Sequence, residues 1–348
     1  MLINRDKYII KGKSLDEIQN WCISKGHSKF RGQQIFEWMY RHGELNPNHM
    51  TNLSLGVIED LKNECIIKTL KIEKVSSSNN ENTKKLLFKT LDNKFIETVS
   101  MIEDNRHTVC ISSQIGCSVD CDFCATASMG IIRNLKTGEI VDQLNHIRNN
   151  IETPISNIVF MGMGEPFLNY TRVIKAAEIF HHHRGFGLGA YRITISTSGI
   201  LPKINQFYEE KHKFKLAISL NASNDETRNK IMPINKKWPI TKLVKVAKDN
   251  AQRNRKVMFE YVLLKDVNDS EENAHELASL LHGVDCKLNV IPYNETDGKY
   301  KRPYKQTIER FLEILSQRQH GYRVLVRWSK GQDIDAGCGQ LAVKQENE

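Results

Sequence analysis

The feature that most constrains the fold is an alternation that begins near residue 107, where short apolar, β-branched runs are separated by enough chain for a helix. Strands that alternate with helices predict parallel βα units. The runs predicted to be strands are Thr108–Ser112, Ile155–Met161, Arg192–Ser196, Lys215–Leu220, Val257–Leu263 and Leu288–Ile291. Six strands are too few for a complete eight-stranded barrel, so the alternation predicts a partial barrel or an open sheet. Both folds bind ligands at the carboxyl ends of their strands.

The first part of the chain has a different pattern, which predicts helices. Ser14 is followed three residues later by Glu17, which is the signature of a capping box at a helix start. Apolar residues recur at helical spacing in Phe30–Tyr40, and Leu55–Asn63 is predicted to be a third helix.

A β-hairpin is predicted between these helices and the alternating region. Leu86–Leu91 and Phe95–Val99 alternate in polarity on either side of a short polar turn. We therefore predict two units: residues 1–95, which hold the helices and most of the hairpin, and residues 96–348, which hold the alternating strands and helices.

Charge and hydropathy limit the environment of the protein. The chain has 50 Lys and Arg against 41 Asp and Glu, and this net charge of +9 suits a polyanionic partner without proving one. No apolar run approaches the ~18–20 residues that a membrane span needs. The N-terminal residues lack the apolar stretch and cleavage site of a signal peptide. The sequence thus predicts a cytoplasmic protein without membrane contact, in a compartment where disulfides are uncommon.

The eight cysteines divide into two groups. Cys22, Cys65 and Cys286 stand among apolar or helical neighbours and are predicted to be buried small hydrophobic residues. The other five are Cys110, Cys117, Cys121, Cys124 and Cys338. Four of these five fall within fifteen residues of one another, and this clustering suggests a shared inorganic centre.

The segment Cys117-x3-Cys121-x2-Cys124 follows the first predicted strand directly. A zinc site and a redox Cys-x-x-Cys pair are the alternatives to an iron–sulfur cluster. Structural zinc needs four closed ligands, and no second Cys-x-x-Cys or His-x-x-x-His pair is present in the sequence. Three cysteines suit a 4Fe-4S cluster whose fourth iron stays open to another ligand.

This cysteine spacing resembles the signature of the radical S-adenosylmethionine (SAM) superfamily, in which the open iron binds SAM and electron transfer generates a 5′-deoxyadenosyl radical. Further segments resemble the RNA adenine methyltransferases of the RlmN/Cfr group, and together these segments extend over nearly the whole chain. They are Phe30–Trp38, Thr108–Cys117, Met161–Pro166, Ser196–Gly199, Met232–Asn235 and Asp333–Leu341. The resemblance implies an α/β fold: a partial (β/α)6 barrel radical SAM core preceded by a small helical accessory domain that binds RNA.

The resemblance also implies a SAM site. Gly164 and Glu165 would meet the amino group of SAM, while the carboxylate, ribose and adenine would be held after later strands. The full implied set is Gly164, Glu165, Ser196, Ser219, Leu220, Asn221 and Asn294. Without the cysteine loop, these residues would be interpreted as ordinary residues of the loops that connect strands to helices. The family usually carries histidine at the position of Asn221, and asparagine cannot titrate, so the role of this position stays open.

The resemblance also implies catalytic roles for two further cysteines and a glutamate. One SAM methylates Cys338, and a radical from a second SAM activates that methyl group for addition to adenine. Glu97 then removes the ring proton, and Cys110 attacks the Cys338 sulfur, which leaves a Cys110–Cys338 disulfide. By residue type alone, Cys338 could be a surface thiol and Cys110 a buried hydrophobic residue. A strand glutamate such as Glu97 usually faces solvent.

RNA contacts are predicted in two places. Lys242, Lys245 and Lys248 share one face of a predicted helix, which could equally be a solvated surface. A second patch follows the last predicted strand and contains Lys299, Lys301, Arg302 and Lys305, with Tyr300 and Tyr304 as possible stacking residues.

The resemblance implies substrates and partners. The expected reaction is methylation of adenine carbon-2 in 23S rRNA near the peptidyl-transferase centre and at adenosine 37 of tRNA. An electron donor such as flavodoxin or ferredoxin is expected, and a monomer suffices. The alternatives are carbon-8 methylation of the antibiotic-resistance type, a non-catalytic iron–sulfur protein that binds RNA, and a zinc-ribbon binding module.

Overall fold

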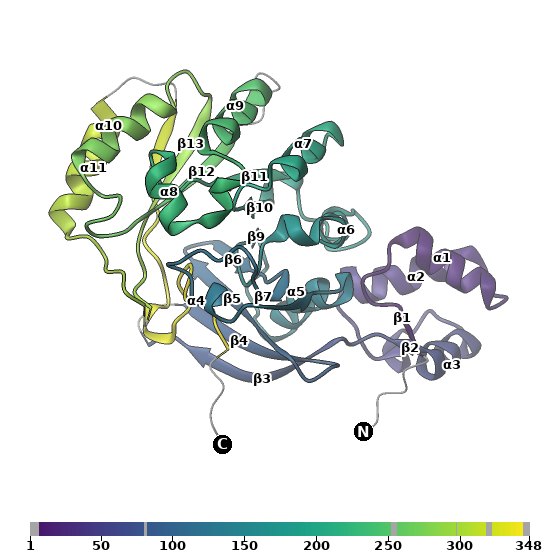
Figure 1. Cartoon of the computed structure of the whole chain (residues 1–348). Coiled ribbons are helices and arrows are strands. Elements are labelled where there is room, and N and C mark those ends of the chain that lie inside the picture. Colours follow the sequence, from purple (N-terminus) through teal and green to yellow (C-terminus); the bar gives the residue numbers. More distant parts are fainter. Residues whose placement is uncertain (1–6, 80–81, 252–255, 297, 318–321, 344–348) are drawn as a thin grey trace.

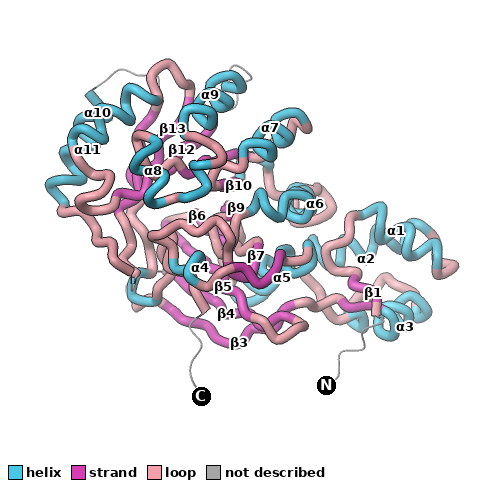
Figure 2. The backbone as a smooth tube through the Cα atoms, viewed as in Figure 1, coloured by secondary structure: helices cyan, strands magenta, loops and turns pink. Residues whose placement is uncertain are grey.

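The computed structural model describes residues 7–79, 82–251, 256–296, 298–317 and 322–343. A group of short helices at the N-terminal end forms a lobe beside a large curved sheet, and the remaining helices lie along the outside of that sheet (Figure 1). Figure 2 shows the same arrangement coloured by secondary structure.

The N-terminal lobe contains the predicted helices. They are α1 (Leu15–Ser24), α2 (Lys29–Phe36), which continues into a π-helical turn (Glu37–His42), and α3 (Leu55–Glu64). The capping box is confirmed, because Ser14 Oγ accepts from the Glu17 backbone N–H and the Glu17 carboxylate accepts from the Ser14 N–H. Strand β1 (Tyr8–Ile9) pairs in parallel with β2 (Cys65–Ile66) and so joins the two ends of the lobe.

A ten-stranded sheet carries the rest of the fold, in the order β14-β13-β12-β11-β10-β9-β6-β5-β4-β3. Seven strands are parallel: β6 (Arg106–Cys110), β9 (Asn157–Phe160), β10 (Ile193–Thr197), β11 (Lys215–Ser219), β12 (Val257–Leu263), β13 (Cys286–Pro292) and β14 (Arg323–Val326). Each parallel strand lies beside the next one along the chain, as in a barrel and unlike a doubly wound sheet. The edge strands β3 and β14 do not pair with each other, so the barrel is partial.

The six strands predicted from the sequence are all present, and β14 is an additional strand that the prediction missed. Three antiparallel strands extend the sheet: β3 (Leu70–Ser77), β4 (Thr83–Thr90) and β5 (Phe95–Glu103). The predicted hairpin is β4–β5, and β5 pairs with β6 of the barrel. The sheet is therefore continuous across the boundary that we predicted between residues 95 and 96.

Helices connect the parallel strands, as expected for βα units. They are α5 (Thr137–Asn150), α6 (Tyr170–His181), α7 (Leu201–Glu209), α8 (Asp225–Ile231), α9 (Ile240–Ala251), α10 (Glu271–Leu280) and α11 (Lys305–Gln317). A short helix α4 (Ala125–Ser128) and a two-stranded sheet, β7 (Gln114–Gly116) with β8 (Ile131–Asn134), follow β6. Among the described residues, no helix combines the length and apolar character that crossing a bilayer requires.

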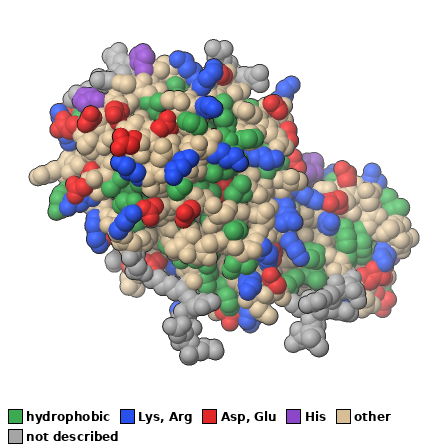
Figure 3. All heavy atoms as spheres, viewed as in Figure 1, with side chains coloured by type: hydrophobic (Ala, Val, Ile, Leu, Met, Phe, Trp, Pro, Cys, Tyr) green, Lys and Arg blue, Asp and Glu red, His purple; other side chains and the backbone are tan. Residues whose placement is uncertain are grey.

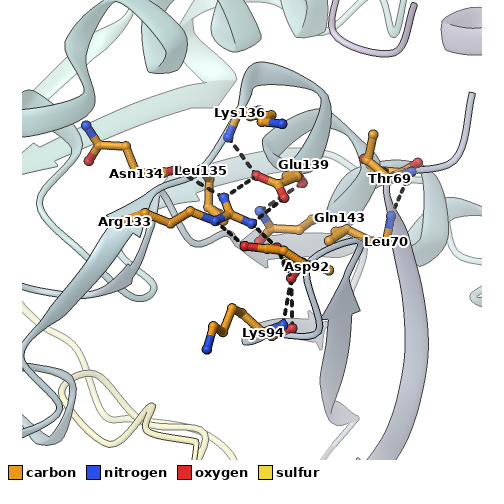
Figure 4. A network of polar contacts seen from close by, with 12 residues as sticks. Thr69, Leu70, Asp92, Lys94, Arg133, Asn134, Leu135, Lys136, Glu139 and Gln143 are labelled. Atoms are coloured by element: carbon orange, nitrogen blue, oxygen red, sulfur yellow. Dashed lines mark hydrogen bonds and ion pairs between the residues drawn. The ribbon is translucent and has the colours of Figure 1, made fainter. Parts of the chain in front are cut away.

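A polar network holds the β4–β5 turn against the barrel (Figure 4). Arg133 on β8 donates to both carboxylate oxygens of Asp92 in the turn, at 2.8 and 2.5 Å, and to both oxygens of Glu139 at the start of α5. The hydrogen bonds from Arg133 hold the pKa of the Asp92 carboxyl well below its usual value. One guanidinium thus fixes the hairpin relative to the first helix of the barrel.

A buried ion pair joins the N-terminal lobe to the barrel. Lys11 Nζ lies 3.2 Å from Asp142 Oδ1 on α5, and neither side chain is exposed. The other oxygen of Asp142 accepts from the Thr69 N–H, the Thr69 hydroxyl and the Leu70 N–H. Burial lowers the pKa of Lys11, and the Asp142 carboxylate opposes that shift. Asp142 therefore ties two segments of the lobe to one barrel helix.

The C-terminal segment lies between the two edges of the sheet. After β14 the chain returns to the β3–β4 side, where Asp333 Oδ2 accepts from the Asn79 N–H and the Asp335 carbonyl accepts from Lys85 Nζ. Gly331 lies so close to Thr83 that a Cβ on this glycine would be 2.6 Å from Thr83 Cγ2. Figure 1 shows this yellow segment beside α4, β4 and β5. We call residues 331–341 the C-terminal loop.

Candidate active site

The three-cysteine loop leaves the end of β7 and returns through α4. Gly116 has a positive φ of 74°, and a Cβ there would lie 1.8 Å from the Gly130 carbonyl, so glycine is required for this close approach. The loop is closed by the Cys117 N–H, which donates to the same Gly130 carbonyl. Cys117, Cys121 and Cys124 are free thiols of intermediate exposure, as a ligand set facing a solvent-accessible centre requires.

The donor set of this loop fits an iron–sulfur cluster. Burial raises the pKa of all three thiols, and the charges of the neighbouring cysteines add to the shift at Cys121. A cationic metal centre reverses that penalty, because a coordinating thiol is deprotonated. Within the described residues, no three His, Cys, Asp or Glu side chains are close enough to hold one metal ion. Sulfur ligands of a single zinc lie within about 4 Å of each other, whereas the ligands of a four-iron cluster are spread more widely.

Cys110 and Cys338 line the same cavity, of about 770 Å³, inside the barrel. Cys110 is the last residue of β6, and its thiol pKa is raised to about 12, mainly by burial, with a further contribution from the Cys338 charge. Cys338 also adds to the raised pKa of Cys124. The structure therefore brings Cys338 near both the strand cysteine and the cluster loop, although the two cysteines are 228 positions apart in the sequence.

Arg327 accompanies this cysteine pair and was missed by the sequence analysis. It lies just after β14 and lines the same cavity, and its Nη1 donates to Met161 Sδ at 3.4 Å. The negative charge of Cys338, followed by Glu260 and Cys110, raises the pKa of Arg327. The charge of Arg327 opposes the rise in the Cys110 pKa that burial causes. The signal that could have found it is the β-branched run Val-Leu-Val that precedes it, which is β14.

Asn294 holds the C-terminal loop at the cysteine. Its Nδ2 donates to the Cys338 carbonyl at 3.1 Å and to Ser329 Oγ at 2.8 Å, and its Oδ1 accepts from Arg302. A Cβ on Gly337 would lie 2.7 Å from Asn294 Cγ, so the loop passes directly over this side chain. The structure thus shows Asn294 in contact with the C-terminal loop, and its contact with SAM stays a prediction.

Glu97 is buried on β5, contrary to the usual position of a strand glutamate. Its Oε1 lies 3.0 Å from Lys85 Nζ. Burial raises the pKa of Glu97, and the charge of Lys85 opposes the rise. Lys85 also donates to the Asp335 carbonyl, so this lysine connects Glu97 to the loop that carries Cys338.

The segment after β9 passes close to the start of β7. Gly164 has a φ of +96°, and a Cβ there would lie 2.4 Å from Gln114 Cβ. Glu165 is buried, and its two carboxylate oxygens accept from the backbone N–H groups of Ser198 and Phe167 at 2.7 and 2.8 Å. Burial raises the pKa of Glu165, and these hydrogen bonds oppose the rise. The carboxylate therefore fixes the loop after β10 as well as its own loop.

Ser196 and Ser219, on neighbouring strands, share a partner that the sequence analysis did not identify. Ser196 Oγ donates to Glu260 Oε2 at 2.6 Å, and Ser219 Oγ lies 3.4 Å from the same oxygen. Glu260 is buried on β12, and its backbone carbonyl accepts from the N–H groups of Leu220 and Asn221. Glu260 therefore connects four of the predicted SAM residues.

Asn221 has a structural reason to be asparagine. Its φ is +57°, a left-handed conformation that asparagine tolerates better than most residues. The side chain is buried, with Oδ1 accepting from the Val262 N–H at 2.9 Å and Nδ2 donating to Met232 Sδ. Its side-chain polar groups are therefore already occupied. Direct contact of position 221 with SAM stays a prediction, and the backbone is the part available for it.

Both predicted RNA patches expose their lysines, but one predicted stacking residue is buried. Lys242, Lys245 and Lys248 are exposed on α9, as predicted. In the other patch, Tyr300 is only 8% exposed and its hydroxyl donates to Asp122 in the cluster loop, so its predicted role as a stacking residue is wrong. Tyr304 is 68% exposed, with Lys265 Nζ over its ring. Figure 3 shows one face of the molecule, and Lys and Arg side chains are spread across it, with several of them in a row over its middle.

Comparison with known proteins identifies the class that this barrel and cysteine loop define. Residues 111–278 match the model of the radical SAM superfamily, and residues 10–67 match the model of the ribosomal RNA large subunit methyltransferase N-terminal domain. The crystal structure of a radical SAM methyltransferase from Sphaerobacter thermophilus is similar, with a TM-score of 0.92 and 40% identity over 97% of this chain and 99% of that one.

Two relatives define the family more narrowly. A protein of Dictyoglomus turgidum, described as "Probable dual-specificity RNA methyltransferase RlmN", is 44% identical over 94% of both chains. The "Dual-specificity RNA methyltransferase RlmN" of Geobacter sulfurreducens is 40% identical over 96% of this chain and 92% of its own. The chain belongs to the RlmN family of radical SAM RNA methyltransferases.

Proposed function

We propose that this enzyme methylates carbon-2 of adenine in 23S rRNA and in tRNA by a methyl-carrier mechanism. The observation that carries this proposal is the shared cavity, which brings Cys338 together with Cys110 at the carboxyl end of β6, beside the cluster loop. The RlmN relatives are described as dual-specificity RNA methyltransferases, which supports two RNA substrates.

The superfamily implies SAM and a 4Fe-4S cluster, and the residues of this chain fit both. Cys117, Cys121 and Cys124 would hold the cluster. The predicted SAM residues would surround its open side: Gly164, Glu165, Ser196, Ser219, Leu220, Asn221 and Asn294. When bound, the cluster and SAM supply the methyl group and the radical chemistry that activates it.

Side chains of the protein carry out the remaining steps of the reaction. Cys338 accepts the methyl group on its sulfur and then carries its carbon to the adenine ring, and Arg327 lines the same cavity. Glu97 takes the ring proton. Cys110, as a thiolate, then attacks the Cys338 sulfur, which breaks the bond between that sulfur and the transferred carbon and forms the Cys110–Cys338 disulfide. The electron pair of the broken bond goes to the adenine and its attached carbon, which takes up a proton and becomes the methyl group.

Partners follow from this chemistry. The N-terminal unit, residues 1–95 by our division, would bind RNA, and the exposed lysines of α9 would contact phosphates. Reduction of the cluster requires an electron donor such as flavodoxin or ferredoxin. One chain supplies every residue that the proposed mechanism uses, so a monomer in the cytoplasm is sufficient.

The test is an anaerobic reaction of the cluster-loaded enzyme with SAM, a reductant and unmodified 23S rRNA or tRNA, followed by nucleoside mass spectrometry. We expect 2-methyladenosine from the native enzyme and none from Cys338→Ala. Formation of 8-methyladenosine would contradict the proposed position of methylation. Product formation by Cys338→Ala would contradict the methyl-carrier mechanism, and the buried Cys286→Ala variant is the matched control for loss of a thiol.

A further inference from the structure

The cavity that holds Cys110 and Cys338 extends to the amino ends of the barrel strands, opposite the cluster loop. Arg106, Thr108 and Cys110 all line it, because alternate residues of a strand face the same side. Arg106 begins β6 and Cys110 ends it, so the cavity spans the length of this strand, about 13 Å at 3.3 Å per residue. Exposed residues at the amino end, such as Tyr191 and Lys215, show that it reaches the surface there.

The mouth of this cavity is basic. Its lining includes Arg106, Lys213, Lys215, Lys256, Lys287 and Lys330. Parallel strands begin at the same edge of a sheet, which gathers the cations that stand at or near the starts of β6, β11, β12 and β13. Lys256 pairs with Asp285, and Lys330 pairs with Glu103. In the part of the chain that the structure describes, Arg106, Lys215 and Lys287 have no carboxylate within 4 Å.

These cations lie close enough to repel one another. Burial lowers the pKa of Lys215, and Lys287, Arg106 and Arg192 lower it further. Unpaired like charges around one opening cost free energy in the absence of an anion, and they attract anions to the opening. The cluster and the predicted SAM residues lie at the carboxyl ends of the strands, so a substrate adenine enters from that side. The basic mouth at the amino ends therefore serves a different ligand.

We propose that the basic mouth admits a small anionic thiol that reduces the Cys110–Cys338 disulfide after each turnover. This inference rests on the proposed function, which produces that disulfide. The cavity is within the ~300–1,000 Å³ range of small-molecule sites, and it gives access to both sulfurs while the C-terminal loop stays packed on the other face.

The exchange balances with two thiols. The first, as a thiolate, attacks one sulfur of the disulfide, releases the other cysteine as a thiolate that takes up a proton, and forms a mixed disulfide. A second thiol attacks the sulfur of the small molecule in that mixed disulfide. Both cysteines are then thiols again, and the two small thiols leave as their own disulfide, having supplied the two electrons.

The experiment uses three small thiols that differ in charge: 2-mercaptoethanesulfonate (anionic), 2-mercaptoethanol (neutral) and cysteamine (cationic). Cluster-loaded enzyme is oxidised anaerobically with one equivalent of diamide, and peptide mass spectrometry follows the loss of the Cys110–Cys338 disulfide. Each rate is divided by the rate of the same thiol with a small neutral disulfide at the same pH, which removes differences in thiolate fraction and nucleophilicity.

We expect the anionic thiol to be at least about tenfold faster than the cationic one at low salt, and this preference to fall at about 1 M salt. In Lys215→Gln/Lys287→Gln the preference should fall to within about twofold. The single variants should be intermediate, and cluster absorption verifies that each variant is folded. The control Lys242→Gln/Lys248→Gln, with the same loss of charge on α9, should keep the full preference.

The outcomes separate this inference from the proposed function. If the disulfide forms and all three thiols reduce it equally, or if the double variant keeps the preference, the basic mouth is not the entry route and the proposed function is unaffected. If Cys110 and Cys338 cannot form a disulfide, both the inference and the resolution step of the proposed function are wrong.

Discussion

At the scale of single residues, burial decides what Glu97 can do. The sequence analysis placed this glutamate on a strand, where such side chains usually face solvent, and only its match to the family suggested a base. The structure buries it on the side of β5 where Lys85 contacts both Glu97 and the C-terminal loop. The charge of Lys85 opposes the effect of burial on the Glu97 pKa, and the charge of Asp335 adds to it.

Replacement of the proposed base should stop the reaction after the covalent step. In Glu97→Gln the amide cannot accept the ring proton, so methylated Cys338 should form normally while RNA stays attached to the protein. Denaturing gel electrophoresis with labelled RNA detects the adduct, and Glu103→Gln on the same strand is the control. Normal release of methylated RNA by Glu97→Gln would rule out this assignment.

Lys85 should control the pH dependence of this step. The raised pKa of Glu97 means that the carboxylate is available only above that pKa, so the rate of RNA release should fall at the acidic end of the profile. Removal of the opposing charge in Lys85→Gln raises the Glu97 pKa further and should move this acidic limb to higher pH. Single-turnover release rates measured across pH test this, with the exposed Lys84→Gln as the control. An unchanged limb would contradict the role of Lys85.

At the scale of elements, the sequence predicted what has a strong local pattern. The capping box of α1, the six apolar strands and the hairpin all have periodic or capping signals, and all are present. β14 was missed because its four residues, Arg-Val-Leu-Val, are only half-buried and follow α11 closely. With β14 unassigned, Arg327 could not be placed beside the cysteine pair. Glu260 was missed because its role depends on contacts between neighbouring strands.

The β4–β5 turn should depend on Arg133. The Arg133→Ala variant leaves the buried Glu139 without its charged donors, and the loss of such hydrogen bonds costs about 2 kcal/mol of unfolding free energy. The Asp92 part of this stabilisation is present above the usual carboxyl pKa of about 4 and is lost as pH falls through the lowered folded value. Urea unfolding at neutral and acidic pH tests this. A difference from the native protein that does not shrink in acid would contradict the Asp92 contribution, and Glu226→Gln on the surface is the control.

The exposed face of α9 should contribute to RNA affinity through charge alone. In Lys242→Gln/Lys245→Gln/Lys248→Gln the RNA affinity should fall, and the slope of log affinity against log salt should decrease by about two to three, because each phosphate contact contributes about 0.7–0.9. Filter binding at several salt concentrations measures the slope. The variant Lys71→Gln/Lys84→Gln/Lys211→Gln loses the same charge elsewhere, and an equal effect there would show that net charge, not α9, is responsible.

At the scale of the whole molecule, the sequence could not predict how its parts are joined. The buried pair Lys11–Asp142 links residues 131 positions apart, and neither has a local pattern that indicates a partner. The same is true of Cys110 and Cys338, which only the resemblance connected. Such contacts arise when the sheet is assembled, because the order of its strands brings distant segments together.

The joint between lobe and barrel should be sensitive to loss of one charge. Asp142→Asn can still accept the Thr69 and Leu70 hydrogen bonds but leaves Lys11 buried without a counter-charge, which costs about 3–5 kcal/mol. In Lys11→Met/Asp142→Asn the orphan charge is gone, so most of that stability should return. Thermal and urea unfolding compare the three proteins. A double variant no more stable than Asp142→Asn would show that charge is not the cause.

The position of the C-terminal loop also determines how the molecule can open. The loop follows one edge strand of the sheet, β14, and its contacts with Asn79, Thr83 and Lys85 lie at the other edge. The barrel is therefore a ring closed by noncovalent contacts, and the segment that closes it carries Cys338. A movement of the whole loop that withdraws this sulfur from Cys110 would also break the contacts of Gly331, Asp333 and Asp335 with the other edge, so departure of the methyl carrier by that route would widen the barrel.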